Sequence, residues 1–299
     1  MYNAENILNE LPEHLMDITP EIAPLGEVSM LDVLGILFLV VLCLCIYLEA
    51  KRPALVRRAQ VLMKSYPLNL STFFFNDLTA SLLSLTSVYY LADAVNEHGL
   101  LVDMKNGAIK YVICFVLLDL TLYAWHYVMH HCDALWSFHR VHHSDPNLNV
   151  TTGLRFHFGE LLLEVMVRTG FILAMGISVE FLLVTQAIMS LFILFHHTNT
   201  RLPGERILSL VFIVPRLHRA HHSTLRSEHD SNYGAVFSVW DRLFGTLKEV
   251  EPEKIGLEGW NEPGFLGMVK SCLLPDFNRA GKVNWIPVRI NKSNDKTEG

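Results

Sequence analysis

Two five-residue histidine motifs constrain this chain more than any other feature of its sequence. Residues 139–143 read H-R-V-H-H and residues 218–222 read H-R-A-H-H, so one H-x-x-H-H pattern occurs twice. On a helix, the first histidine lies three and four residues from the other two, which puts all three imidazoles on one side. Such an array chelates metal ions, and its repetition argues against two unrelated polar turns.

Further histidines accompany the two motifs. His126 and His130 are four residues apart near the end of an apolar segment, so both rings leave the same helix face. Together with the two motifs, this pair supplies eight imidazoles, which is more than one tetrahedral zinc ion accepts. Two ions with four or five nitrogen ligands each would use all eight.

An acidic residue lies deeper in the segment that carries His126. Asp119 and Tyr123 precede His126 by seven and three residues and share its helix face. A carboxylate inside an apolar segment needs a partner. Two arrangements are open: Asp119 orients a ligand imidazole and fixes its tautomer, or it bonds a tyrosine hydroxyl or helix backbone.

The apolar residues are concentrated in blocks. These blocks cover residues 33–47, 73–91, 108–128, 161–177 and 181–195. A membrane span needs about 20 apolar residues to cross a core of about 30 Å, and the first three blocks reach that length with their flanks, whereas the last two are short. We therefore expect an all-α, multi-span membrane bundle of about four to five spans with a histidine-rich helical cap.

The charges beside the first block predict its orientation. Residues 1–29 carry six acidic residues and no Lys or Arg, whereas Lys51, Arg52 and further basic residues follow the block. The positive-inside rule then places the N-terminus outside and the histidine groups at the cytoplasmic face. No basic region precedes the block, which favours a span over a cleaved signal peptide.

This orientation divides the chain into three regions. We expect an acidic external segment over residues 1–29, a membrane-embedded domain over 30–250, and a cytoplasmic extension over 251–299 that ends in a disordered tail. The net charge of −6 and the lack of a basic stripe exclude nucleic acid as a partner. The five cysteines have no disulfide or zinc spacing and are typical of small apolar fillers.

Segments beside the histidines resemble a known family. They are D-L-T-L-Y-A-W-H (119–126), T-T-G-L-R-F-H (151–157), F-H-H-T-N-T-R-L-P (195–203), and S-N-Y-G followed by W-D-R-L-F-G-T (231–246). Over about residues 110–247 the chain is similar to the fatty acid hydroxylase/sterol desaturase superfamily. Members of that superfamily are membrane enzymes with a histidine-coordinated di-iron centre.

The resemblance implies a set of functional residues. The metal ligands would be His126, His130, His139, His142, His143, His218, His221 and His222, with His197 added from an H-x-N element that also contains Asn199. His157 is a further candidate, either as a ligand or as a donor to one. Asp119, Tyr123 and Asn199 are candidate catalytic residues.

The resemblance also implies a reaction. Two iron ions and O2 would oxidise a C–H bond of a membrane lipid, such as a fatty acyl chain or sterol, by hydroxylation, desaturation or ether cleavage. The chain has no dinucleotide fingerprint, haem attachment motif or iron–sulfur cysteine framework. We therefore expect a separate electron donor of the ferredoxin or cytochrome type, with its reductase.

Two other classes of protein use membrane histidines. A metal transporter needs ligands near the bilayer midplane and a path to both faces, whereas these histidines gather on one side. A zinc hydrolase needs three ligands and an open position.

Residues near the main histidine groups carry weaker expectations. His131 points away from the face of His126 and is expected at the surface, and His229 lies in a polar run and is expected to be solvated. Glu160, Glu164 and Arg168 share a helix face, either as internal ion pairs or as the lining of a polar entrance.

Overall fold

The computed structural model describes residues 30–55, 59–95, 98–105, 107–260 and 264–271. Within these residues every regular element is a helix, and β-structure is limited to isolated bridges. The elements are α3 (Met30–Lys51), α4 (Ala59–Leu82), α5 (Leu85–Ala94), α6 (Ala108–His131), α7 (Asp133–His143), the 3-10 helix η1 (Val150–Leu154), α8 (Phe158–Met175), α9 (Val179–His197), α10 (Glu205–Leu208), α11 (Pro215–His221), α12 (Arg226–His229), α13 (Val239–Leu243) and α14 (Gly264–Lys270). The expected all-α class is confirmed.

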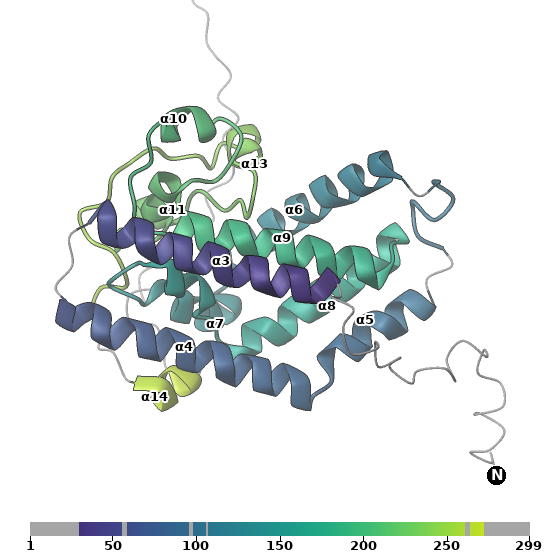
Figure 1. Ribbon diagram of the computed structural model, residues 1–299, viewed down its shortest axis with the longest axis horizontal. Helices are drawn as coiled ribbons and strands as arrows, with labels where there is room; N and C mark the ends of the chain where they lie inside the picture. The colour runs from purple at the N-terminus through teal and green to yellow at the C-terminus, as the bar shows by residue number, and fades with distance from the viewer. Residues whose placement is uncertain (1–29, 56–58, 96–97, 106, 261–263, 272–299) are drawn as a thin grey trace, which may run out of the picture.

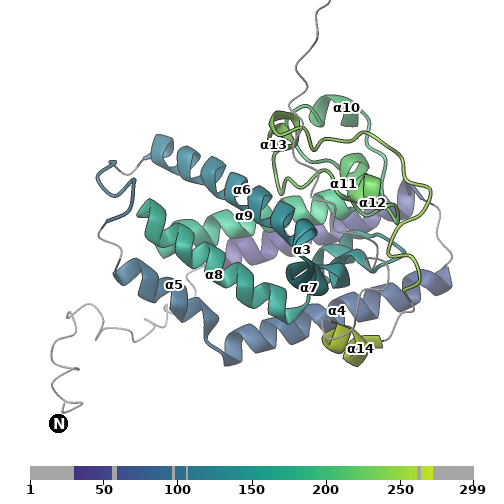
Figure 2. The ribbon, with the colours of Figure 1, turned by 180° about the vertical axis from the view of Figure 1, so that it is seen from behind.

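The long helices form a bundle with a cap at one end. Helices α3, α4, α6, α8 and α9 run alongside one another, and the short helices α10, α11 and α13 gather at one end of them (Figure 1). The view from behind adds α12 to this end and shows α7 beside the end of α6 (Figure 2). Helix α3 contacts α9, α6 contacts α7, and η1 contacts both α4 and α9. The histidine motifs therefore lie in the cap.

Three helices are long and apolar enough to cross a membrane. They are α3 from Asp32 onward, α6 and α9. Helix α3 exposes Val33, Ile36 and Val40 by more than half of their surface, as lipid contact requires. The chain is therefore an all-α membrane bundle.

The expected division into spans is wrong for two blocks. The block at residues 73–91 is divided between α4 and α5 at a turn where Ser84 has a φ of 48°. The block at 181–195 is not short, because it extends in both directions to form the whole of α9. Local capping explains this extension: the Ser178 hydroxyl accepts a hydrogen bond from the Phe181 N–H, and Gly176 ends α8 in the left-handed conformation.

One face of α6 is buried in the core and sets the position of its histidines. Cys114, Leu118 and Leu122 follow one another at four-residue spacing and pack with apolar residues of α8 and α9. The same periodicity carries the buried face onward to His130. Packing of α6 therefore turns the His126 and His130 rings toward the cap.

The part of the C-terminal extension that the structure describes packs on the bundle. In α14, the Phe265 ring lies 5.2 Å from the Phe75 ring of α4. The backbone oxygen of Val269 lies 2.9 Å from His157 Nε2. The expected external segment, residues 1–29, and the expected disordered tail lie outside the described residues.

Candidate metal centre

Nine histidines converge in two groups inside the cap. The first group comprises His126, His130, His139, His143 and His221, and the second comprises His142, His197, His218 and His222. Within each group, one nitrogen of each ring lies within 4.8 Å of the others. The sequence-based expectation of two ions with four or five nitrogens each matches this division.

Each H-x-x-H-H motif contributes to both groups. In the first motif, His139 and His143 join the first group, whereas His142 joins the second. The second motif has the reverse arrangement, since His218 and His222 join the second group and His221 joins the first. Residues four apart overlie each other on a helix, and the ring three residues on is rotated away from that line. The two groups are therefore adjacent, and the His143 and His222 rings lie 4.5 Å apart.

Within each group, ring nitrogens that carry a lone pair face one another at short distance. His126 Nδ1 and His139 Nδ1 donate to Tyr233 O and Glu160 Oε1, so the proton of each ring is on Nδ1. Their Nε2 atoms, which carry lone pairs, lie only 3.0 Å apart. Two lone pairs repel at this distance unless a cation lies between them, so these rings fit a bound metal ion.

The second group has the same property. His197 Nδ1 donates to Ile193 O at 2.7 Å, and its Nε2 lies 3.1 Å from His142 Nε2 and 2.9 Å from His218 Nε2. Two nitrogens bound at right angles, each about 2.1 Å from one ion, are about 3.0 Å apart. The spacing in both groups therefore fits neighbouring ligands of a single ion, and an all-imidazole set suits iron, zinc, copper or nickel.

Hydrogen bonds from the cap orient most of the rings. Backbone oxygens accept from His126, His142, His197 and His221, and carboxylates accept from His139 and His130. Such partners fix the tautomer of a ligand and raise its basicity. Among the described residues, His221 Nε2 and both ring nitrogens of His143 have no hydrogen-bond partner, which leaves them available to metal.

Burial keeps the imidazoles of the cap neutral. It lowers the pKa of His139 to about 3 and lowers the pKa of His142, His218 and His222 well below the ordinary value, with neighbouring histidines adding to the effect on the last three. A metal ligand must be deprotonated, so the fold prepares these rings for binding.

The sequence profile of the family described as Fatty acid hydroxylase matches residues 111–246, a range that contains all nine of these histidines. The histidine-bearing region of the chain is therefore similar to the fatty acid hydroxylase superfamily. The ornithine lipid hydroxylase OlsE of Rhizobium tropici is 32% identical over 183 residues, which is 60% of this chain and 54% of that protein.

Relatives from animals match a shorter region. The alkylglycerol monooxygenase of Homo sapiens is 31% identical over 143 residues, or 47% of this chain and 31% of that protein. The corresponding protein of Caenorhabditis elegans is 30% identical over 141 residues, or 46% of this chain and 27% of that protein. The matched regions thus span about half or less of these curated relatives. No solved structure matches the chain.

His157, His196 and His131 lie outside the two groups. His157 Nδ1 accepts from the Gly159 N–H at the start of α8, and its Nε2 faces Val269 O. Both nitrogens of His157 are therefore engaged, and the structure does not support it as a ligand. The His196 ring lies 4.0 Å from the His218 ring, and His131 is exposed, as expected.

His229 is buried, so the expectation that it is solvated is wrong. Only 7% of its surface is exposed, and its ring stacks on Trp136. With His130 and Asp230 it forms a third cluster that could hold a metal ion. His130 Nδ1 lies 3.2 Å from Asp230 Oδ1, so Asp230 serves to orient a ring of the first group.

The three candidate catalytic residues all bond away from the imidazoles. Asp119 accepts from the backbone N–H groups of Val236 and Phe237 and from Trp240 Nε1, so neither of the expected partners is correct. Tyr123 bonds the Thr246 hydroxyl. Asn199 bonds both backbone groups of Leu55 through its side-chain amide. These residues hold together the loops around the metal centre.

Two carboxylates that support the centre are not apparent from sequence spacing. Glu49, at the end of α3, accepts from the N–H groups of Val150 and Asn199. Asp145, two residues after the first motif, accepts from the side chains of Ser65, Asn69 and Thr152. Glu49 lies just after the first apolar block and Asp145 just after the first H-x-x-H-H motif, but the groups that they bond lie on other elements. The sequence alone therefore does not indicate these contacts.

A cavity of about 320 Å³ lies beside both histidine groups, although none of the nine histidines lines it. It lies between α3, α4, α8 and α9. Of its lining residues, Glu160 bonds His139, and the Phe156 ring stacks on His142 at 4.7 Å. A Cβ atom on Gly153, which also lines it, would lie 3.1 Å from His197 Nδ1. Residues that line the cavity therefore contact members of both histidine groups.

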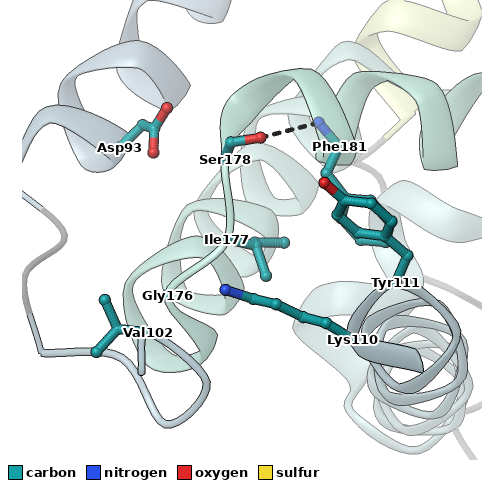
Figure 3. A pocket seen from close by; sticks show the side chains of 8 residues that line it. All are labelled: Asp93, Val102, Lys110, Tyr111, Gly176, Ile177, Ser178 and Phe181. Atoms are coloured by element: carbon teal, nitrogen blue, oxygen red, sulfur yellow. Dashed lines mark hydrogen bonds between the residues drawn. The ribbon is translucent and has the colours of Figure 1, made fainter. Parts of the chain in front are cut away.

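A second cavity, of about 260 Å³, lies at the opposite end of the bundle, where α8 ends and α6 begins. Figure 3 shows the Lys110 side chain extending toward Gly176 and Ile177, with Asp93 across the cavity. Lys110 at the start of α6 lines it, whereas His126 and His130 lie at the other end of that helix. It is therefore separate from the metal centre.

Proposed function

We propose that this chain is a membrane-bound di-iron oxygenase that hydroxylates a lipid with O2 and with electrons from a separate donor protein. The proposal depends mainly on one observation: in both histidine groups, Nε2 atoms of different rings lie about 3 Å apart. This spacing fits two adjacent metal ions, one in each group. The relatives named as a lipid hydroxylase and as alkylglycerol monooxygenases support hydroxylation over desaturation.

The proposed reaction balances with one O2 and two electrons. One oxygen atom enters the C–H bond to give C–OH, and the other leaves as water after taking up two protons. The iron pair, when bound, supplies the redox chemistry. Electrons would come from a ferredoxin- or cytochrome-type protein docked on the cap.

The protein orients the histidine ligands, excludes water from them and gives the substrate access to them. Tyr233 O and Glu160 hold the protons of His126 and His139 on Nδ1, so both Nε2 atoms face the first ion. Phe156 packs flat against His142 and covers the second group. A lipid chain would enter the cavity beside these residues, which lies between α3, α4, α8 and α9.

The arrangement of the helix ends supports a cytoplasmic active site. Just after α3, the backbone around Pro53 pairs with that around Thr200, close to the histidine end of α9. Lys51 and Arg52 therefore lie at the same end of the bundle as the metal centre. By the positive-inside rule this end is cytoplasmic.

A metal transporter and a zinc hydrolase are less well supported. Both ligand groups lie at one end of the bundle, whereas transport needs a site near its middle. The nine histidines also exceed the three ligands of a catalytic zinc.

The test combines metal analysis with product analysis. We expect the purified chain in lipid nanodiscs to bind two irons, and to transfer one atom of isotopically labelled O2 into a lipid only when a reduced donor is added. His142→Ala should lose iron and activity. One zinc per chain without iron, or intact iron loading with no labelled lipid in the presence of donor and extracted host lipids, would overturn the proposal.

A further inference from the structure

The cavity at the end of the bundle opposite the metal centre contains a buried lysine. Lys110, in the first turn of α6, is 6% exposed, and its side chain extends into the cavity toward Gly176 (Figure 3). Among the described residues its ammonium has no hydrogen-bond or ion-pair partner, and it stays open to the cavity. A buried charge without a partner is costly. The cavity therefore lacks a negatively charged group that these residues do not supply.

The position of Lys110 in α6 adds to this positive charge. The first turn of a helix carries a partial positive charge, which acidic residues and capping side chains normally balance. Helix α6 has no acidic residue in its first turn, and its N-cap residue, Gly107, has no side chain that could cap it. An anion bound here would balance both the ammonium and the start of the helix.

The carboxylate on the cavity wall, that of Asp93, is engaged elsewhere. Asp93 lies across the cavity from Lys110 (Figure 3), and its Oδ2 accepts from the Val179 N–H at 3.2 Å, at the start of α9. The Ser178 hydroxyl accepts from the Phe181 N–H in the same turn. The chain therefore caps the start of α9 itself, and Asp93 balances that helix start and not the Lys110 ammonium.

Close packing around the cavity fixes its walls. A Cβ atom on Gly99 would lie 2.0 Å from the Gly176 nitrogen, so the loop after α5 packs directly on the turn that ends α8. On the opposite wall, the Tyr111 ring stacks on the Phe181 ring at 5.0 Å. The cavity is thus formed before any ligand binds, as is usual for small-molecule sites.

The cavity lies at the depth where lipid head groups meet the bundle. Lys110 and His130 are twenty residues apart on α6, or about 30 Å at 1.5 Å per residue, which is about the thickness of the hydrocarbon core. With the histidine groups at one membrane surface, the cavity lies at the other. Ile109 and Val112, which flank two of its lining residues, are 71% and 63% exposed, as contact with acyl chains requires. A cationic cavity beside an apolar surface suits an amphipathic anion.

We propose that this cavity binds the phosphate group of a phospholipid in the leaflet opposite the metal centre. The Lys110 ammonium, with three N–H donors, holds the phosphate oxygens, and the Ser178 hydroxyl offers a further donor. The acyl chains lie on the exposed apolar surface of α6. Because the cavity is separate from the metal centre, this lipid is a structural partner and not a substrate, and the inference does not depend on the proposed function.

Binding in detergent and phosphate-free buffer tests this site. The full chain in dodecyl maltoside is titrated with dioctanoyl phosphatidic acid, with dioctanoylglycerol, which has the same chains but no phosphate, and with inorganic phosphate. We expect the phosphatidic acid to bind about tenfold more tightly than either, and to raise the melting temperature. Equal binding of phosphatidic acid and dioctanoylglycerol would overturn the proposal. Inorganic phosphate that binds as tightly as the lipid would overturn it as well, since the site would then serve free anions.

Three substitutions separate this site from general charge attraction. Lys110→Met should weaken binding of the phosphatidic acid about tenfold, and the variant should fold, because it removes a buried charge that has no partner. Asp93→Asn should strengthen binding, since it removes a negative charge from the cavity wall, whereas a purely structural role would make both variants bind more weakly. Lys105→Gln removes an exposed positive charge outside the cavity, five residues before Lys110, and should leave binding unchanged. Equal losses in Lys105→Gln and Lys110→Met would contradict the proposal.

Discussion

His139 Nδ1 lies 2.8 Å from Glu160 Oε1, and both side chains are almost completely buried. This contact joins a ligand of the first histidine group to the wall of the cavity. The Glu160 side chain thus both orients the His139 ring and lines the cavity.

Removal of this carboxylate should weaken the first metal site. We expect Glu160→Ala to lower iron affinity and activity about 10–100-fold, the usual effect of losing a partner that orients a ligand. Glu160→Gln keeps an acceptor oxygen and should lose less. Iron titration of the purified variants gives the measurement, with Glu180→Ala as the control, and an alanine variant with unchanged iron affinity would contradict the assignment.

His157 and His197 should behave differently although both are conspicuous in the sequence. His197→Ala removes a member of the second group and should lower bound iron from two toward one per chain. His157→Ala should keep both irons but lower the free energy of unfolding by about 0.5–2 kcal/mol, because His157 caps α8. Metal analysis and thermal unfolding distinguish the two, and iron loss in His157→Ala would refute this reading.

Substitution of Asp119 should mainly lower the stability of the fold and should affect the metal centre only indirectly. Its carboxylate accepts from Val236, Phe237 and Trp240, so Asp119→Ala leaves buried donors unsatisfied, at about 1–3 kcal/mol each. We expect a melting temperature several degrees lower, with Asp119→Asn intermediate. If Asp119→Ala melted like the unmodified chain but lost its iron, Asp119 would belong to the metal centre.

The metal-free cap should be sensitive to acid. Burial lowers the folded-state pKa of His139 to about 3, and that of His143 and His221 well below the ordinary value of 6.5. The unfolded chain then binds more protons between these values, so the stabilisation is present above pH 6.5 and is lost as the pH falls below it. Each such histidine contributes about 1.4 kcal/mol per pH unit.

Unfolding of chelator-treated protein between pH 8 and pH 5 measures this effect. The melting temperature should be level at the alkaline end and fall steeply below about pH 6.5, and iron should shift the fall to lower pH by competing with protons. A melting temperature that is independent of pH over this range would show that the imidazoles are not buried in the neutral form.

Much of the metal centre could be predicted because it depends on short spacings. The helical period places His126 above His130 and His139 above His143 whatever the fold around them, and the apolar blocks make a helical membrane bundle the only stable outcome. These features alone predicted the all-α class and eight of the nine histidines that the structure gathers, whereas His197 was implied by the family resemblance.

The partners of each side chain were decided by tertiary packing. Asp119 faces donors more than a hundred residues later, and Glu49 reaches Val150 and Asn199 from another helix. The division of each H-x-x-H-H motif between two groups requires the histidine rings at the ends of α7 and α11 to meet. Sequence periodicity determines which side chains share a helix face, but only the packing of helices decides what that face meets.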